Sequence, residues 1–292
     1  MIVLCYHKIN DRVNDWNHIT VTPDTFMKQM EFVMNHYDVV TTAYAYESEH
    51  TVSISFDDGY EDSVTNILPL LEKLRIPATF FISTQRLGSD EEDWCNELSR
   101  RIMRGGQEKT NIEIGEEKIS TLSVEDRKKA NIQIFNYLKG LDNKRRDDWM
   151  HFIREWAGAS SDEPRKEFRM LGFEQLKLLS ESELVTIGAH TVNHPSLACL
   201  DYNDQEYEIK DSINAIKKIT GKAVEQFAYP FGGTKDYNQD TFQILKQNGI
   251  LRAFSTWNKR ILSDINYEIP RICVTECSMQ NFIYKIKHPF SC

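Results

Sequence analysis

The sequence lacks any long apolar run. No stretch of about 18 consecutive apolar residues occurs in the 292-residue chain, which excludes a helix that spans a membrane. The first residues, Met1–Lys8, are apolar at only a few positions and have neither a positively charged start nor a small-residue cleavage site, so they do not indicate a signal peptide. We interpret them as a buried strand and predict a cytoplasmic location.

Cysteine pairs with a meaningful spacing are also missing. No two cysteines form a Cys-x-x-Cys pair, and their positions make no regular ladder: 5, 95, 199, 273, 277 and 292. This excludes a zinc knuckle and a disulfide framework. Free thiols agree with a reducing compartment.

An excess of basic residues is absent as well. The chain has 35 Lys+Arg against 44 Asp+Glu, which gives a formal net charge of −9. A nucleic acid or an anionic membrane is therefore excluded as the main partner, because a basic surface is needed to displace the counterions of phosphates. With 40% hydrophobic and 27% charged residues, the composition is that of a soluble globular protein. The oligomeric state is left open.

Short apolar runs alternate with amphipathic segments at both ends of the chain. Strand-like runs lie at 2–6, 37–41, 52–56, 77–83, 184–190 and 226–230. Helical periodicity is found at 23–34, 62–74, 207–219 and 239–248. Strands that alternate with helices predict parallel βα units, in a barrel or an open sheet.

This alternation stops after about residue 89. Charge-rich helical stretches follow at 124–138 and 147–157, and a hairpin is indicated at 111–120. We predict a single domain over 1–292 that is interrupted by a helical insertion at about 90–182. Such an insertion is tolerated because long surface loops cost little closure entropy.

Two adjacent carboxylates end the apolar run Ser53–Phe56. Asp57 and Asp58 are followed directly by Gly59. Neighbouring strand residues point to opposite faces, so the two carboxylates cannot have the same task. One is free to bind a metal while the other acts as a base. A simple turn at a strand end is the alternative, since Asp-Gly is a common turn dipeptide.

Two histidines four residues apart follow the run Leu184–Ala189. His190 and His194 stand where an apolar strand ends, as Asp58 does. Two histidines and one carboxylate form a ligand set for a catalytic divalent metal such as zinc. A single histidine here would be interpreted as structural, whereas the pair favours a metal site.

A third element is the stretch Phe227–Gly233. Pro230 and Phe231 precede two glycines at the end of a strand-like run. A tight turn of this kind exposes backbone N–H groups that can hold an oxyanion. Taken alone, the pattern is also typical of an ordinary turn.

Together these stretches resemble the polysaccharide deacetylases of the NodB-homology type, a carbohydrate esterase family. Ser55–Gly59 matches the family's Thr/Ser-Phe-Asp-Asp-Gly motif, and His190–His194 matches its His-Ser/Thr-x-x-His motif. Pro77–Ile82 follows the first motif as it does in the family. The resemblance covers nearly the whole chain outside the insertion. It implies an α/β fold, a distorted (β/α)7-type barrel of the glycoside hydrolase/deacetylase kind.

Two family features are missing. In many members the third motif begins with an arginine that braces the catalytic aspartate, and that position is Ala228 here. A later Leu-x-His motif, which supplies a general acid, is absent from the C-terminal part. The opening Leu4–His7 resembles a branch in which that strand has moved to the N-terminus by circular permutation. The segment around Arg271 resembles the same branch, which makes Arg271 the candidate replacement for the brace.

The resemblance implies a metal-dependent hydrolase that removes an N-acetyl group from an amino sugar in a glycan or glycan precursor. Asp58, His190 and His194 are the implied metal ligands. Zinc is the first choice of cofactor, with Co²⁺, Ni²⁺ or Mn²⁺ as alternatives.

The implied catalytic groups are assigned in the same way. Asp57 is the base, and the N–H of Phe231 holds the oxyanion. His7 is the acid, although a lone histidine on a buried strand is otherwise more often structural. A water or His288 is its substitute if His7 fails. Arg271 is the brace of Asp57.

Two other functions stay open at this point. One is an amide hydrolase of the same fold that acts on a small non-sugar substrate. The other is a carbohydrate-binding protein without turnover, which Ala228 favours and the retained Asp57 opposes. The missing leader favours an intermediate of surface-polysaccharide or lipopolysaccharide synthesis as substrate. Trp94–Leu98 also resembles a segment of deacetylases with helical inserts, where an aromatic side chain either stacks on a sugar or only packs.

Overall fold

A computed structural model describes residues 2–44, 50–257 and 265–289. Its main sheet is built from parallel pairs in the order β12-β11-β10-β9-β6-β5-β1-β13, and the short β4 (Asp38–Val39) pairs with β5. The other strands are β1 (Ile2–Tyr6), β5 (Thr51–Phe56), β6 (Ala78–Ile82), β9 (Val185–Ala189), β10 (Gln226–Ala228), β11 (Arg252–Ser255), β12 (Ile269–Pro270) and β13 (Ile272–Cys273). The alternation of strands and helices predicted from the sequence is confirmed.

One extended segment, Ile269–Cys273, joins the two ends of this sheet. Its first half pairs with β11 and its second half pairs with β1. Arg271 lies between the halves, and its N–H donates to Ser255 O at 3.0 Å. When Ile269–Cys273 is counted as one strand, the nearly closed barrel has seven strands along its path. This confirms the expected fold class. The first strand of the chain is thereby closed against the last.

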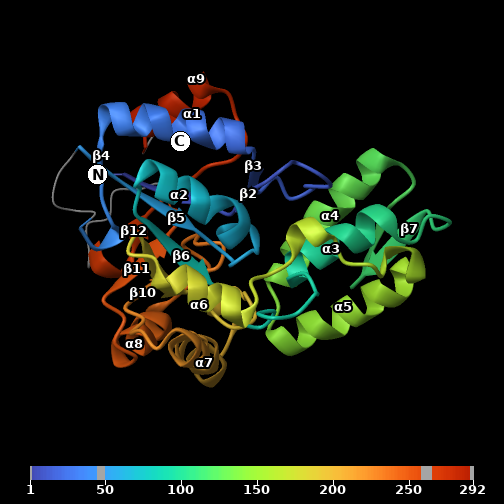
Figure 1. Cartoon of the computed structure of the whole chain (residues 1–292). Helices are drawn as coiled ribbons and strands as arrows, with labels where there is room; N and C mark the ends of the chain where they lie inside the picture. The colour runs from blue at the N-terminus through green and yellow to red at the C-terminus, as the bar shows by residue number, and fades with distance from the viewer. Residues whose placement is uncertain (1, 45–49, 258–264, 290–292) are drawn as a thin grey trace.

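Helices cover the outside of the barrel (Figure 1). They are α1 (Pro23–His36), α2 (Leu68–Leu74), α6 (Phe173–Glu181), α7 (Tyr202–Thr220), α8 (Gln239–Gln247) and α9 (Met279–Lys287). Side chains of Thr22, Asp201, Asn238 and Ser278 cap the N-termini of α1, α7, α8 and α9, where backbone N–H groups have no partner within the helix. The helix predicted over 62–74 starts as a π-helical turn, Ser63–Ile67, and continues as α2.

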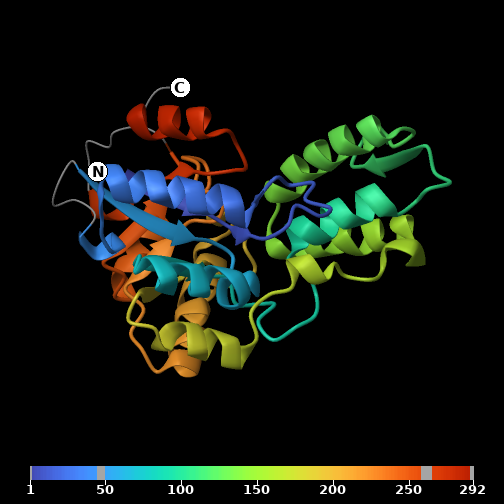
Figure 2. The same ribbon diagram turned by 45° about the horizontal axis from the view of Figure 1, so that its top comes forward.

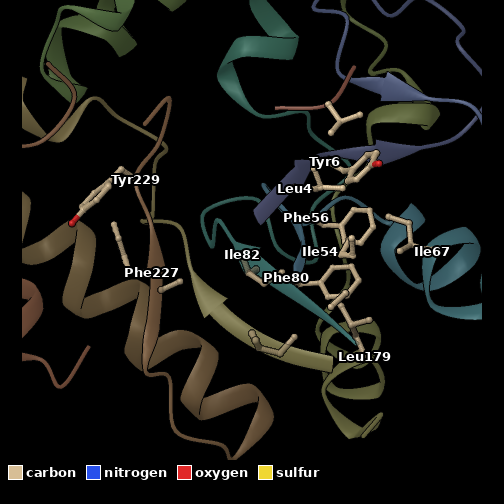
Figure 3. Close-up of a cluster of buried hydrophobic side chains, with 14 of the residues drawn as sticks. Leu4, Tyr6, Ile54, Phe56, Ile67, Phe80, Ile82, Leu179, Phe227 and Tyr229 are labelled. Carbon is tan, nitrogen blue, oxygen red and sulfur yellow. The ribbon is translucent and has the colours of Figure 1, made fainter. Parts of the chain in front are cut away.

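Alternate strand residues face two different cores. Leu4, Ile54, Phe56 and Phe80 belong to the large cluster between strands and helices (Figure 3). Residues at the intervening strand positions point the other way. A separate small cluster on that side consists of Val3, Phe81, Ala228, Phe254 and Ile269. Because side chains alternate along a strand, Asp57 continues the row of buried Ser53 and Ser55.

The segment between β6 and β9 has a core of its own. It contains α3 (Trp94–Arg104), the hairpin β7 (Asn111–Ile114) and β8 (Glu117–Ser120), α4 (Val124–Lys139) and α5 (Asn143–Ala157). Its buried cluster runs from Trp94 to Ala157, and Figures 1 and 2 show it at one side of the barrel. α6 instead places Leu176 and Leu179 in the barrel's cluster. A single domain with an insertion at about 90–182 stays a prediction.

A loop between two short strands reaches from the barrel to this insertion (Figure 2). It connects β2 (Lys8–Ile9) with β3 (Thr20–Val21). Asn17 Nδ2 donates to Asn96 Oδ1 on α3 at 3.0 Å. Among the helices in the described ranges, none is both long and apolar enough to cross a membrane.

Candidate active site

The predicted site residues meet at the carboxyl ends of the parallel strands. A cavity of about 640 Å³ opens there, and its lining includes His7, Asp57, Asp58, His190, His194 and Phe231. These ends lie at one edge of a parallel barrel, where ligand sites of such folds form. Arg271 lies beneath them and is 1% exposed. Residues from both ends of the chain and from its middle are thereby brought together.

Asp58, His190 and His194 converge. Asp58 Oδ1 lies 3.5 Å from His190 Nε2 and 3.3 Å from His194 Nε2. The same oxygen is buried and has no hydrogen-bond partner within the described part of the chain. An orphaned carboxylate oxygen that faces two imidazole nitrogens fits a divalent cation, because these are the donor atoms that zinc takes. Burial raises the pKa of Asp58, but the two imidazoles more than offset this and hold it well below its usual value.

The ring of His190 is oriented by a backbone carbonyl. Its Nδ1 lies 2.7 Å from Ala228 O. A carbonyl oxygen can only accept, so Nδ1 carries the proton and Nε2 keeps its lone pair free toward Asp58. Orientation of a ligand histidine through its second nitrogen is common in metal sites.

A second group of donor atoms lies next to the first. Cys5, His7 and Asp57 also bring one ligand atom each within 4.8 Å of one another. Both oxygens of Asp57, however, already accept from Arg271. The free oxygen of Asp58 therefore makes the Asp58 group the better cation site of the two.

The backbone of the site is in an unusual conformation. Asp58, Thr191, His194 and Phe231 have φ values of 73°, 68°, 52° and 63°. Side chains other than glycine rarely occupy this left-handed region, and such strain gathers at functional sites. Gly232, with φ 70°, follows Phe231 and lies so close to the end of β11 that an added Cβ would be 2.6 Å from Thr256 N.

Arg271 is the cation that holds Asp57. Its Nη1 donates to Asp57 Oδ1 at 2.6 Å and its Nη2 donates to Oδ2 at 2.7 Å. Nη1 also donates to Ser55 Oγ at 3.2 Å. Burial raises the pKa of Asp57, but the nearby Arg271 and then His190 outweigh it, so the pKa lies below its ordinary value. Asp57 is therefore ionised at neutral pH.

His7 and Phe231 flank these carboxylates. His7 follows β1 directly and lines the cavity beside Asp57. The ring of Phe231 packs edge to face on His194, with centroids 4.8 Å apart, and its carbonyl accepts from Thr256 Oγ1 at 2.6 Å. His288, the substitute for His7, is the residue that ends α9 beside Tyr284. It is not among the described residues that line the cavity.

Sequence reasoning missed Glu208, a buried carboxylate on α7. Its Oε2 accepts from the backbone N–H groups of Val192 (2.9 Å) and Asn193 (2.8 Å), between the two histidines. Its Oε1 accepts from the side-chain amide of Asn143 on α5 at 2.6 Å. A usable signal was present, because Glu208 lies on the buried face of α7 next to Ile209.

The insertion also contacts this loop through Trp94. The indole N–H donates to His194 O at 3.0 Å. The Trp94 ring stacks on Phe135 of α4 at 5.6 Å between centroids and meets Phe231 at 6.2 Å. Trp94 thus packs and donates a hydrogen bond behind the histidine.

Asp93 and Tyr60 form a further polar group at the cavity wall. Tyr60 Oη donates to Asp93 Oδ2 at 3.1 Å, and Asn96 Nδ2 donates to Tyr60 Oη at 2.6 Å. Burial, and after it the charge of Asp58, raises the pKa of Asp93. In the sequence, nothing marks this group beyond the position of Asp93 as the N-cap of α3.

Known proteins share this fold over almost its entire length. The deacetylase PplD of Streptococcus pyogenes, solved in complex with acetate, superimposes with a TM-score of 0.60 at 17% identity and covers 98% of this chain and 97% of its own. IcaB of Ammonifex degensii gives a TM-score of 0.59 at 16% identity and covers 99% and 97%.

Sequence comparison extends the likeness beyond the fold. The poly-beta-1,6-N-acetyl-D-glucosamine N-deacetylase of Staphylococcus epidermidis is 22% identical over 303 aligned positions, which cover 97% of this chain and 81% of the relative. A family profile described as polysaccharide deacetylase matches residues 44–111 and 115–253. Since this match spans well over half of the sequence, the chain belongs to the polysaccharide deacetylase family.

Proposed function

We propose that the chain is a metal-dependent hydrolase that removes the N-acetyl group from an amino sugar. The observation that carries the proposal is the meeting, in one cavity, of the Asp58–His190–His194 group with an ionised Asp57 held by Arg271. A three-donor site with open positions next to a general base is the arrangement that hydrolysis of an unactivated amide needs.

The proposed cation ligands are Asp58 Oδ1, His190 Nε2 and His194 Nε2. When bound, a divalent ion supplies Lewis acidity, which polarises a carbonyl and lowers the pKa of a water to about 7. Zinc is the proposed ion, because two imidazoles and one carboxylate suit it. Cobalt, nickel and manganese are the alternatives to be compared with it.

Asp57 is the proposed general base. Each carboxylate oxygen has two lone pairs. Oδ2 accepts from Arg271 and, at 3.4 Å, from the Cys5 thiol, whereas Oδ1 accepts from Arg271 alone among the described residues, so Oδ1 keeps a lone pair to accept a proton. Water adds to the acetamide carbonyl carbon and its proton passes to Asp57. The negative charge that develops on the carbonyl oxygen is proposed to face the Phe231 N–H, as an oxyanion hole requires.

His7 is the proposed general acid. When the C–N bond breaks, the amine nitrogen must take a proton, because an amide anion is too basic to leave. His7 lines the cavity, and one of its ring nitrogens lies within 4.8 Å of an Asp57 oxygen. Acetate and a free amino sugar are the products.

The substrate class is inferred from relatives and from the site. The named substrate of the Staphylococcus epidermidis relative, poly-beta-1,6-N-acetyl-D-glucosamine, supports N-acetylglucosamine polymers as first probes. The Arg271–Asp57 pair supports turnover over a binding protein that has lost its base. A cytoplasmic location and a glycan precursor as substrate stay predictions.

Acetate release tests the proposal. The protein is stripped with a chelator, reloaded with each of the four metals, and assayed on N-acetylglucosamine oligomers, lipid-linked sugars, nucleotide sugars and acetylated small amines. We expect metal-dependent acetate release from a sugar substrate. Acetate from small amines alone would support the non-sugar amide hydrolase, and sugar binding without acetate would support the binding protein.

His190→Ala separates the metal site from the rest. The variant should lose bound metal by elemental analysis together with activity. His151→Ala is the matched control, because His151 is exposed on α5 with its side chain 72% accessible. Unchanged metal content in the His190 variant would contradict the proposed ligand set.

A further inference from the structure

The active-site cavity extends beyond the proposed catalytic residues toward the insertion. One wall of this extension is a face of α4, which contributes Asn131 and Phe135, and the other is the β2–β3 loop, which contributes Trp16 and Asn17. Figure 2 shows this loop reaching the insertion helices. We call the space lined by these four residues the α4 subsite. None of the proposed reaction steps uses it.

The α4 wall is continuous with the catalytic centre. Asn131 and Phe135 are four residues apart, so they lie on one face of the helix. Phe135 packs edge to face on Phe231, with ring centroids 5.7 Å apart, and stacks on Trp94. A ligand group bound at the subsite would therefore lie next to the group that reacts at Phe231.

Asn131 carries the observation that points to a ligand. It lines the cavity although it is only 6% exposed. Its Oδ1 is buried without a hydrogen-bond partner among the described residues. A buried amide oxygen that is left unpaired is unfavourable and rare. A ligand that supplies a hydrogen-bond donor at this point removes that cost.

The opposite wall is held in place by the protein itself. The guanidinium of Arg165 lies over the Trp16 ring at 4.9 Å. Asn17 Nδ2 donates to Asn96 Oδ1 and to Cys95 O, at 3.0 and 3.3 Å. These contacts fix the loop against α3, so the wall is organised before any ligand arrives.

We propose that the α4 subsite binds the sugar residue next to the one that is deacetylated, with the Asn131 amide bonded to one of its hydroxyl groups. A sugar hydroxyl both donates and accepts, so it matches an amide in either orientation. Aromatic side chains and few polar groups suit a sugar ring, which has apolar faces and a polar rim. The inference rests on the proposed function and makes the insertion the element that selects a glycan over a monosaccharide.

The test compares chain lengths in two variants. Asn131→Leu removes the hydrogen-bonding amide and keeps a side chain of similar size. Gln133→Leu is the matched control, because Gln133 lies on the exposed face of the same helix. Acetate release is measured on N-acetylglucosamine and on its β-1,4- and β-1,6-linked dimer to pentamer. Binding of the corresponding glucosamine oligomers to metal-free protein is measured by calorimetry.

We expect wild-type kcat/KM to rise from monomer to oligomer. In Asn131→Leu the oligomer value should fall about fivefold to tenfold, the effect of one hydrogen bond, while the monomer value and the thermal midpoint stay unchanged. An equal loss on monomer and oligomer, a loss in the Gln133 control, or no oligomer preference in wild type would overturn the subsite.

Calorimetry separates this inference from the proposed function. If no acetylated sugar is hydrolysed, the proposed function fails, and oligomer binding that Asn131→Leu weakens still supports the subsite. If sugars are hydrolysed but metal-free wild type and metal-free Asn131→Leu bind the oligomers equally well, the α4 subsite is wrong and the proposed function stands. Asn131→Ala, a smaller change at the same position, is the second variant, used if Asn131→Leu does not fold, and the same outcomes apply to it.

Discussion

Arg271 holds Asp57 through two N–H···O bonds of 2.6 and 2.7 Å, across a separation of 214 residues in sequence. In the family pattern an arginine at the position of Ala228 has this task. Here Ala228 instead places its carbonyl 2.7 Å from His190 Nδ1. The arginine that holds the aspartate therefore lies in the segment that closes the barrel. Asp57, the proposed base, still has a cationic partner.

Arg271→Met should move the pH dependence of the reaction. Without the guanidinium, burial dominates and the pKa of Asp57 rises. Since ionised Asp57 is the active form, the acidic limb of kcat/KM should move up by about one to two pH units. Arg271→Lys, which keeps a charge, should show a smaller shift.

Arg145→Met is the control for this experiment, because the Arg145 side chain is 74% accessible on α5. The buried carboxylate left without its partner should also destabilise the Arg271→Met variant by roughly 3–5 kcal/mol. An acidic limb that stays at the wild-type pH in both Arg271 variants would show that the pair does not tune the base.

Asp57→Asn should separate catalysis from metal binding. The amide cannot accept a proton from water, so we expect kcat to fall by about 10² to 10⁴. Metal content should stay at the wild-type level, since Asp58 and the two histidines are unchanged. Near-normal turnover would refute the assignment of Asp57 as base.

His7→Gln tests the acid that the N-terminal strand supplies. Glutamine can form hydrogen bonds but cannot protonate the leaving amine, so kcat should fall by about 10² to 10⁴. His288→Gln, measured in parallel, should behave as wild type, because His288 ends α9 outside the described cavity lining. The reverse result would exchange the two roles.

Glu208→Ala should weaken metal binding without removing a ligand. Its carboxylate holds the backbone of Val192 and Asn193 between the two histidines. We expect the dissociation constant for zinc, measured by competition with a chromophoric chelator, to rise about 10-fold to 100-fold. Glu208→Gln should recover part of the loss.

Glu206→Gln is the matched control for Glu208, because Glu206 lies on the same helix with its side chain 42% accessible. A lower thermal midpoint in Glu208→Ala together with an unchanged zinc affinity would mean that Glu208 supports the fold and not the ligands.

Asp62→Asn should change how stability depends on pH. Asp62 accepts from Ile9 N at 2.9 Å and lies 3.5 Å from Lys8 Nζ. Burial raises its pKa to about 6, against the opposing effect of Lys8. Because the folded state holds this proton more tightly than the unfolded state, the stabilising contribution is present below about pH 4 and is lost as pH rises through 6.

Urea unfolding at pH 4, 5, 6 and 7 measures this effect. From pH 4 to 7, the unfolding free energy of wild type should fall by roughly 2–3 kcal/mol relative to Asp62→Asn. Asp211→Asn, an exposed position on α7, should follow wild type. Parallel curves for wild type and Asp62→Asn would contradict the raised pKa.

Local patterns in the sequence were enough to predict most strands and helices of the barrel, the hairpin at 111–120 and the Asp57–Asp58 and His190–His194 groups. They missed the strands β11, β12 and β13 and the helices α6 and α9. These predictions succeed because side-chain periodicity and strand-end position are set by neighbouring residues. The parallel arrangement then places strand ends at one edge, so the three proposed metal ligands could be grouped without coordinates.

The family resemblance named Arg271 as the brace of Asp57, but only the tertiary structure decided how the distant groups meet. Barrel closure through Ile269–Cys273 brings Arg271 to Asp57, and the packing of α7 brings Glu208 to the histidine loop. The left-handed backbone at Asp58, His194 and Phe231 is likewise imposed by the surrounding fold. Such contacts depend on long-range packing and charge pairing, so a local pattern can mark a residue such as Glu208 without naming its partner. The sequence thus determined the reactive groups, and the closed barrel determined the partners that hold them.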